Sequence, residues 1–122
     1  MGIRVLVIED NPTNLELMTY LLTAFGHTAI SARGGEDGIK LALSERPDLI
    51  LCDIHLPDID GFQIVRRLKQ APELKRVPIV AVTASAMAGD REQVLGAGFD
   101  GYMSKPIVPE TFVQDVQKYL RP

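Results

Sequence analysis

Short apolar stretches alternate with amphipathic stretches along the 122-residue chain. The apolar stretches are rich in β-branched residues and too short for typical helices, so each predicts a strand. The strong ones are Ile3 to Ile8, Leu49 to Cys52 and Ile79 to Val82, and the more polar ones are Thr28 to Ala32 and Gly101 to Ser104. Strands that alternate with helices pair in parallel, with helices on both faces of the sheet.

Between these strands, apolar residues recur at spacings of three and four, which predicts helices. Leu15, Met18, Leu22 and Phe25 are expected to share one face of the first helix. Later helical faces are Phe62, Val65 and Leu68, then Phe112 or Val113 with Val116 and Leu120, and residues 36–46 and 90–95 supply the remaining helices.

The ends of the first helix are marked in the sequence. Asn11-Pro12 resembles an N-cap followed by proline at the first helical position. Gly26 follows the helix as a C-terminal glycine would. We therefore expect a helix between these two points.

The order of the strands follows from their polarity. Fully apolar strands belong in the centre of a parallel sheet and more polar ones at its edges. The first, third and fourth strands are therefore central, which favours the order 2-1-3-4-5 in a doubly wound α/β sheet. In that order the first and third strands are neighbours where the winding reverses, and ligands bind at the carboxyl ends of the strands there.

Composition restricts the class of protein. With 46% hydrophobic and 24% charged residues, the chain can bury a core as a single domain over residues 1–122. A net charge of -3 without any basic run argues against direct nucleic-acid binding. The single cysteine, Cys52, indicates a reducing compartment, and no apolar run is long enough to span a membrane. We expect a cytoplasmic protein.

Chemically active side chains stand at the carboxyl ends of the predicted strands. The first strand ends in Glu9 and Asp10, the third ends in Asp53, the fourth ends in Thr83, and Lys105 follows the fifth. The topology brings them into one crevice.

Each of these residues also has an ordinary structural interpretation. Asp10 could cap the first helix, Glu9 could be a solvated loop charge, and Asp53 could cap the turn before Pro57. Thr83 is a common strand residue, and Lys105 resembles an ordinary surface lysine. These interpretations do not explain why all of them coincide at strand ends.

Three converging carboxylates require compensation. Two carboxylates about 5 Å apart repel by roughly 3 kcal/mol at an effective dielectric of about 20. Oxygen ligands suit Mg²⁺, with Mn²⁺ as an alternative, better than zinc. His27 and His55 have no partner at metal-ligand spacing and are interpreted as surface residues. A metal, a hydroxyl and a lysine together suit a phosphoryl group, for which Asp53 would be the nucleophile.

Four motifs then resemble one family, the receiver domains of two-component response regulators. They are VLVIEDNPTN, DLILCDIHLPDIDG, VPIVAVTA and GYMSKP. They match the acidic, phosphoacceptor, switch-threonine and lysine-proline motifs in order, and the resemblance covers essentially the whole chain. It implies a flavodoxin-like (βα)5 fold, as in CheY.

The resemblance also implies a role for each residue. Asp53 would be the phosphoacceptor, and Glu9, Asp10, Asp53 and the backbone carbonyl of His55 would bind Mg²⁺. Thr83 and Lys105 would contact the phosphoryl group. Thr83 and Tyr102 would form the switch, and a cis peptide would join Lys105 to Pro106.

The implied partners are a histidine kinase or histidine phosphotransfer protein, and a target bound by the fourth helix, fifth strand and fifth helix. Nothing that would bind DNA follows Pro122, so we expect a stand-alone regulator or a receiver from a larger protein. Two positions depart from the commonest family pattern. Glu9 stands where aspartate is more frequent, and His55 stands where asparagine or methionine is more usual.

Proteins of other classes fit less well. A phosphatase of the haloacid dehalogenase type places its aspartate nucleophile on the first strand and its acidic pair last, the reverse of the order here. A flavodoxin needs a hydroxyl-rich phosphate loop after the first strand, where EDNPTN has two carboxylates. A receiver-like module that is never phosphorylated usually lacks an acid or the lysine.

Overall fold

A computed structural model describes residues 2–84 and 88–120 of the chain. Five parallel strands form one sheet in the order β2-β1-β3-β4-β5, as predicted. The strands are β1 (Arg4–Ile8), β2 (Thr28–Ala32), β3 (Leu49–Asp53), β4 (Ile79–Thr83) and β5 (Gly101–Ser104). The fold is the predicted doubly wound, flavodoxin-like α/β fold.

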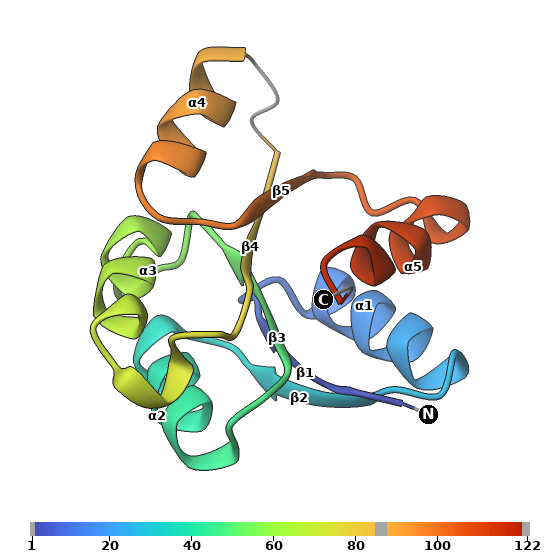
Figure 1. Cartoon of the computed structure of the whole chain (residues 1–122). Helices are drawn as coiled ribbons and strands as arrows, with labels where there is room; N and C mark the ends of the chain where they lie inside the picture. The colour runs from blue at the N-terminus through green and yellow to red at the C-terminus, as the bar shows by residue number, and fades with distance from the viewer. Residues whose placement is uncertain (1, 85–87, 121–122) are drawn as a thin grey trace.

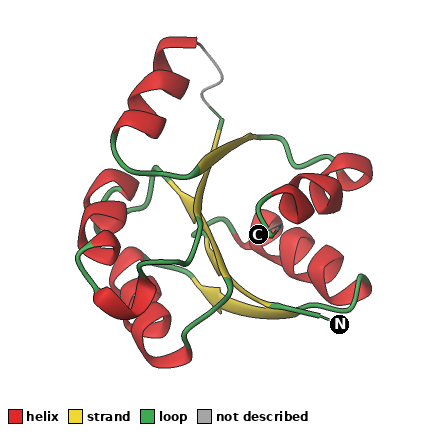
Figure 2. Cartoon of the chain, in the orientation of Figure 1, coloured by secondary structure: helices red, strands yellow, loops and turns green. Residues whose placement is uncertain are grey.

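Helices cover both faces of this sheet (Figures 1 and 2). They are α1 (Pro12–Ala24), α2 (Gly35–Glu45), α3 (Gly61–Lys69), α4 (Ala88–Gly96) and α5 (Pro109–Lys118), with a short 3₁₀ helix, η1 (Pro72–Leu74). Helices α1 and α5 lie on one face, and α2 and α3 on the other, with α4 beyond α3 (Figure 1). Among the described residues, no helix is both long and apolar enough to cross a membrane.

Alternating side chains of the central strands build two separate cores. Leu6 and Ile50 face the core beneath α2 and α3, whereas Val5 and Leu51 face the core beneath α1 and α5. This follows from the two-residue period of a strand. It explains why β1, β3 and β4 are almost continuously apolar, because both of their faces are covered.

Both ends of α1 match the sequence prediction. The Asn11 side chain accepts a hydrogen bond from the Asn14 N–H at 3.0 Å, and Pro12 follows it. Gly26 has a φ of 88°, which suits a glycine after a helix. Phe25 does not belong to the buried face, however. The helix ends at Ala24, so Phe25 lies at the C-cap with 59% of its surface exposed.

Other boundaries differ by one or two residues. β1 ends at Ile8, so Glu9 and Asp10 follow it, whereas Asp53 and Thr83 are the last residues of β3 and β4, as predicted. Helix α4 is longer than the predicted 90–95, and η1 has no counterpart in the prediction. The consequence for the site is that Asp53 and Thr83 are held by the sheet itself.

The loop that follows β3 is attached to the start of α2. Gly34, the N-cap residue of α2, has no side chain that could cap the helix. Asp58 supplies the cap instead, because its carboxylate accepts the N–H groups of Gly35 and Glu36, each at 2.9 Å. These hydrogen bonds lower the pKa of Asp58 to about 2.

Replacing Asp58 with alanine should therefore destabilise the fold at neutral pH, by about 1 kcal/mol, the usual worth of an N-cap. Exposure of Asp58 keeps the effect near this value. Since the pKa is lower in the folded state, the contribution is complete above about pH 5 and declines as the pH falls toward about 2.

Urea unfolding of wild type and Asp58→Ala at several pH values measures this difference. Glu92→Gln, an exposed acid on α4, is the control and should show a much smaller effect. A difference for Asp58→Ala that stays constant between about pH 5 and about pH 3 would show that the carboxylate charge does not provide the stabilisation.

Candidate functional site

The carboxyl ends of β1 and β3 bring two acidic side chains together. Ile8 pairs with Cys52 in the register of these strands. The residues that follow, Glu9 and Asp53, therefore lie side by side on the opposite face of the sheet from Ile8 and Cys52. Both are buried, with 0% and 5% of their surfaces exposed. Burying two adjacent carboxylates is unfavourable unless a cation compensates them.

Lys105 provides that compensation from the loop after β5. Its Nζ lies 2.8 Å from Glu9 Oε1 and 3.1 Å from Asp53 Oδ2. Burial raises the pKa of Glu9, and the ion pair with Lys105 opposes that shift only in part. Burial alone would lower the pKa of Lys105, but its bonds to Glu9 and Asp53 raise it, so the ammonium stays charged.

Asp53 is held in place by the loop that follows it. Its Oδ1 accepts the backbone N–H of His55 at 3.0 Å. The loop folds back on itself where the Gly61 N–H donates to the Ile54 carbonyl at 2.8 Å. A Cβ on Gly61 would stand 2.7 Å from the Cα of Ile54, so only glycine allows this approach. The loop after β3 thus fixes the position of the Asp53 carboxylate through the His55 N–H.

Asp10 completes a cluster of three carboxylates. Oxygens of Glu9, Asp10 and Asp53 lie within 4.8 Å of one another, and Asp10 is partly exposed. Two oxygens bound to one Mg²⁺ lie at most about 4.2 Å apart, so this cluster needs only a small closure or a bridging water. Among the described residues, no donor has good hydrogen-bond geometry toward the buried Glu9 Oε1, although Lys105 Nζ lies 2.8 Å away. The residues present therefore fit a hard divalent cation.

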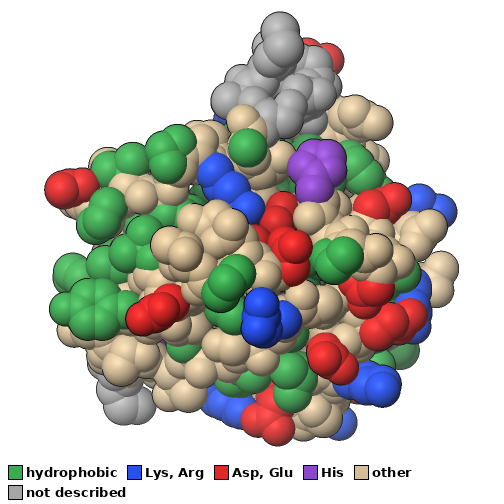
Figure 3. Space-filling model, turned by 180° about the vertical axis from the view of Figure 1, so that it is seen from behind, with side chains coloured by type: hydrophobic (Ala, Val, Ile, Leu, Met, Phe, Trp, Pro, Cys, Tyr) green, Lys and Arg blue, Asp and Glu red, His purple; other side chains and the backbone are tan. Residues whose placement is uncertain are grey.

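The remaining predicted residues come from β4, β5 and the loops that follow β3 and β5. Thr83 is 1% exposed and ends β4, where its carbonyl accepts the Lys105 N–H at 2.8 Å. Tyr102 is half-buried and packs against the core beneath α2 and α3. His55 is exposed, and the peptide bond between Lys105 and Pro106 is cis. From behind, acidic side chains lie next to a basic side chain and a histidine (Figure 3).

Several structural interpretations of single residues are wrong. Glu9 is not a solvated loop charge, because it is fully buried. Asp10 does not cap α1, because Asn11 has that role. Lys105 is not an ordinary surface lysine, because its side chain is only 15% exposed. Asp53 does cap the turn after β3, but it also pairs with Lys105.

Three further contacts or burials, in the site and outside it, could not be recognised from the sequence. The Asn11 N–H donates to Glu9 Oε2 at 3.1 Å, a contact between residues two apart that orients the buried acid. His27 was interpreted as a surface residue, but it is half-buried and its Nδ1 accepts the Ile3 N–H at 3.2 Å. Cys52 is fully buried. Burial is the main cause that raises the pKa of its thiol, and the nearby charges of Asp53 and Glu9 raise it further. Cys52 is therefore an inert core residue.

Comparison with known proteins agrees with this arrangement. Residues 5–117 match the model of the response regulator receiver domain. The polar-differentiation response regulator DivK of Brucella anthropi is 41% identical over 116 residues, which are 95% of this chain and 94% of that protein.

Solved structures show the same fold. The receiver domain of the sensor histidine kinase PA1611 from Pseudomonas aeruginosa is 33% identical with a TM-score of 0.89, over 98% of each chain. Its structure has a magnesium ion coordinated in the active site cleft. The chemotaxis response regulator CheY4 of Vibrio cholerae has a TM-score of 0.94 at 24% identity, over 98% of this chain and 100% of that one.

Proposed function

Because this chain belongs to the response regulator receiver domain family, we propose that it accepts a phosphoryl group on Asp53 from a phosphohistidine. The observation that carries the proposal is the position of Lys105, which contacts both Glu9 and Asp53 in a buried acidic cluster. A lysine at this point can neutralise a phosphoryl oxygen beside the carboxylate that attacks it. Among the described residues, no acid outside this cluster pairs with Lys105.

In the proposed reaction, an Asp53 carboxylate oxygen attacks phosphorus as the P–N bond of the phosphohistidine breaks. The electron pair of that bond returns to the imidazole nitrogen, and an acyl phosphate forms on Asp53. Lys105 and the hydroxyl of Thr83 would each take one phosphoryl oxygen. Glu9 and the loop at His55 would keep the Asp53 carboxylate oriented. Glu9 holds Lys105, which also pairs with Asp53, and the His55 N–H donates to the Asp53 carboxylate itself.

Glu9, Asp10, Asp53 and the His55 carbonyl would hold Mg²⁺, or Mn²⁺ in its place. The ion would supply positive charge to offset the phosphoryl oxygens and the acidic cluster. The oxygen-only donor set and the spacing of the three carboxylates support this assignment.

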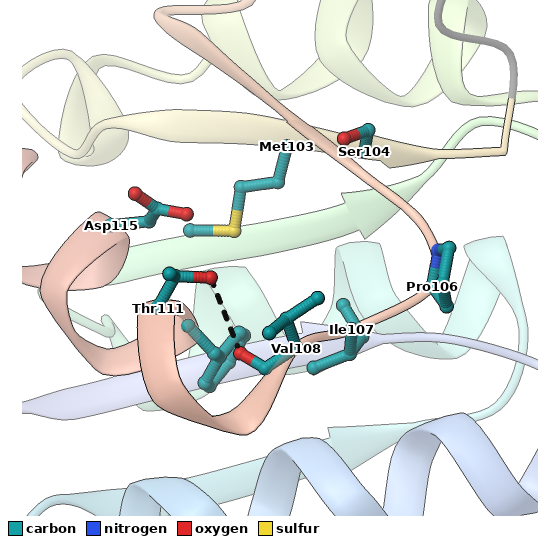
Figure 4. Close-up of a pocket in the computed structure, with 8 residues that line it drawn as sticks. Met103, Ser104, Pro106, Ile107, Val108, Thr111 and Asp115 are labelled. Carbon is teal, nitrogen blue, oxygen red and sulfur yellow. Dashed lines mark hydrogen bonds between the residues drawn. The ribbon is translucent and has the colours of Figure 1, made fainter.

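The output surface is proposed to comprise α4, β5 and α5. Thr83 is the last residue of β4 and pairs with Ser104 of β5. Movement of the Thr83 hydroxyl toward a phosphoryl oxygen would therefore change the packing against β5. Tyr102, partly buried on β5, is the aromatic side chain placed to respond. A pocket of about 100 Å³ lies between β5 and α5 (Figure 4). In it, Met103 of β5 points toward α5, and the Thr111 hydroxyl donates a hydrogen bond to the Val108 carbonyl.

The partners of this site would be a histidine kinase or a histidine phosphotransfer protein as donor, and a protein target on the α4–β5–α5 surface. We place the protein in the cytoplasm, as one receiver domain over residues 1–122. Similarity to the response regulator DivK, 94% of which is covered, and to the receiver domain of a sensor histidine kinase supports both forms of organisation.

Beryllofluoride with Mg²⁺ tests the site, because it imitates a phosphoryl group on a carboxylate. We expect large changes in the amide spectrum at Asn11 and His55, which donate to Glu9 and Asp53, and at Lys105. Without Mg²⁺ the changes should be absent. Changes of equal size without Mg²⁺, or none in its presence, would contradict the proposal.

Replacing Thr83 with alanine should separate phosphorylation from the output. Shifting a two-state equilibrium from 1:99 to equal populations requires about 2.7 kcal/mol, within reach of one or two charge-assisted hydrogen bonds. In Thr83→Ala, beryllofluoride should still change the amide signals of Asn11 and His55, but the changes along β5 and α5 should largely disappear.

Thr28→Ala is the matched control, since Thr28 is an exposed residue of β2 at the opposite edge of the sheet. It should keep the full response along β5. If Thr83→Ala also keeps that response, the signal does not pass through the Thr83 hydroxyl.

A further inference from the structure

A second cavity lies at the opposite end of the sheet from Asp53. It is lined by the end of α3, the segment between η1 and β4, the start of β5 and the end of α5. Since β4 begins at Ile79 and ends at Thr83, the cavity and the acidic cluster are separated by roughly 13 Å of strand. The proposed phosphorylation chemistry makes no use of this cavity.

Positive charge dominates its lining, although the whole chain has a net charge of -3. Lys69, Lys75 and Arg76 face one acid, Asp100. That acid is already engaged, because its Oδ2 accepts hydrogen bonds from Lys69 Nζ and the Ile79 N–H, each at 2.8 Å. Within the described residues, Lys75 and Arg76 have no acidic partner. These two cations remain available for a ligand.

An ordered aromatic wall adjoins these cations. The Tyr119 hydroxyl accepts the backbone N–H of Tyr102 at 3.2 Å. The Tyr119 ring also fills the space where a side chain at position 101 would stand, which explains the glycine there. Because the hydroxyl accepts that bond through a lone pair, its own proton remains able to donate. Tyr119 thus lines the cavity together with Lys75 and Arg76, and its hydroxyl proton can donate.

We propose that this cavity, defined by Lys75, Arg76 and Tyr119, binds a small phosphate-bearing anion. Arg76 can bind two oxygens of a phosphate at once, and Lys75 adds a compact charge. The cavity volume is about 210 Å³, below the roughly 300 Å³ at which pockets for larger ligands begin. The space therefore suits a phosphate group rather than a whole nucleotide.

Occupancy of this site would act on β5. The tyrosine that lines the cavity holds the N–H of Tyr102, the residue assigned to the switch. An anion that draws the Tyr119 hydroxyl proton would alter that hydrogen bond. The site would therefore connect a small anion to the output strand from the end opposite Asp53, whether or not Asp53 is phosphorylated.

The test is an amide spectrum titrated with inorganic phosphate, without Mg²⁺, at an ionic strength held constant with sodium chloride. We expect saturable changes at Val77, Asp100 and Tyr102. A parallel titration with adenosine monophosphate distinguishes a free phosphate from a phosphate ester. If both ligands saturate the amide changes at the same concentration, the site recognises the phosphate group alone. If adenosine monophosphate saturates them at a lower concentration, the site prefers a phosphate ester.

Lys75→Gln and Arg76→Gln should each weaken binding several-fold, and the double variant at least tenfold. Lys40→Gln, which removes an exposed cation of α2, should bind like wild type. The inference is overturned if the changes never saturate, if they centre on Glu9 and His55, or if Lys40→Gln loses as much affinity as the double variant.

Discussion

Substituting Asp53 with asparagine is expected to abolish phosphorylation. The amide has nearly the same shape as the carboxylate, but it cannot attack phosphorus. Mixed with acetyl phosphate and Mg²⁺, wild type should gain an acid-labile phosphoryl group within minutes, and Asp53→Asn should gain none. Intact-protein mass spectrometry measures the added phosphoryl directly.

Asp60→Asn is a close control. Asp60 lies seven residues further along and caps α3 by accepting the Gln63 N–H at 2.9 Å. Asparagine is an equally good N-cap, so this variant should fold and accept phosphate like wild type. Phosphorylation of Asp53→Asn at the wild-type rate would show that another residue is the acceptor.

The second large effect is expected from Lys105→Met. This change removes the cation that pairs with Glu9 and Asp53 but keeps a long apolar chain at a site that is mostly buried. Breaking a buried ion pair from one side usually costs 3–5 kcal/mol. We expect a loss of about 3 kcal/mol in the metal-free protein, since the acids can relieve part of the repulsion by binding protons. Denaturant unfolding with a chelator present measures it.

A double-mutant cycle separates charge from packing in this result. Glu9→Gln in the Lys105→Met background should recover part of the lost stability, because it removes the buried charge left without a partner. Lys40→Met, on the exposed face of α2, should change stability little. If Lys105→Met is as stable as wild type, the ion pairs at the strand ends do not hold the acidic cluster together.

Much of the fold could be predicted from the sequence. β1, β3 and β4 are buried on both faces, and strands of this kind are recognised in a sequence by their almost continuous apolar residues. That burial sets the strand order, and the order alone brings the ends of β1 and β3 together. Helix ends were predictable where a local cap exists, as at Asn11. Phe25 was misplaced because spacing alone does not show that a helix stops one residue earlier.

The details of the site depend on contacts that are distant in sequence. Nothing near Glu9 shows that it is buried, since its burial depends on Lys105, 96 residues away. The cap that Asp58 gives α2 and the bond between Tyr119 and Tyr102 likewise join separate elements. Periodicity and capping rules describe neighbours along the chain, so such contacts need the three-dimensional structure.

The central claim is that the buried carboxylate at the end of β3 receives the phosphoryl group. Borohydride reduction of the phosphorylated wild-type protein tests it most directly, because it converts an acyl phosphate at an aspartate into homoserine. Peptide mapping by mass spectrometry then locates the change. The account predicts conversion at Asp53 alone and only when Mg²⁺ was present; conversion at Asp10, or at any other carboxylate in place of Asp53, would contradict it.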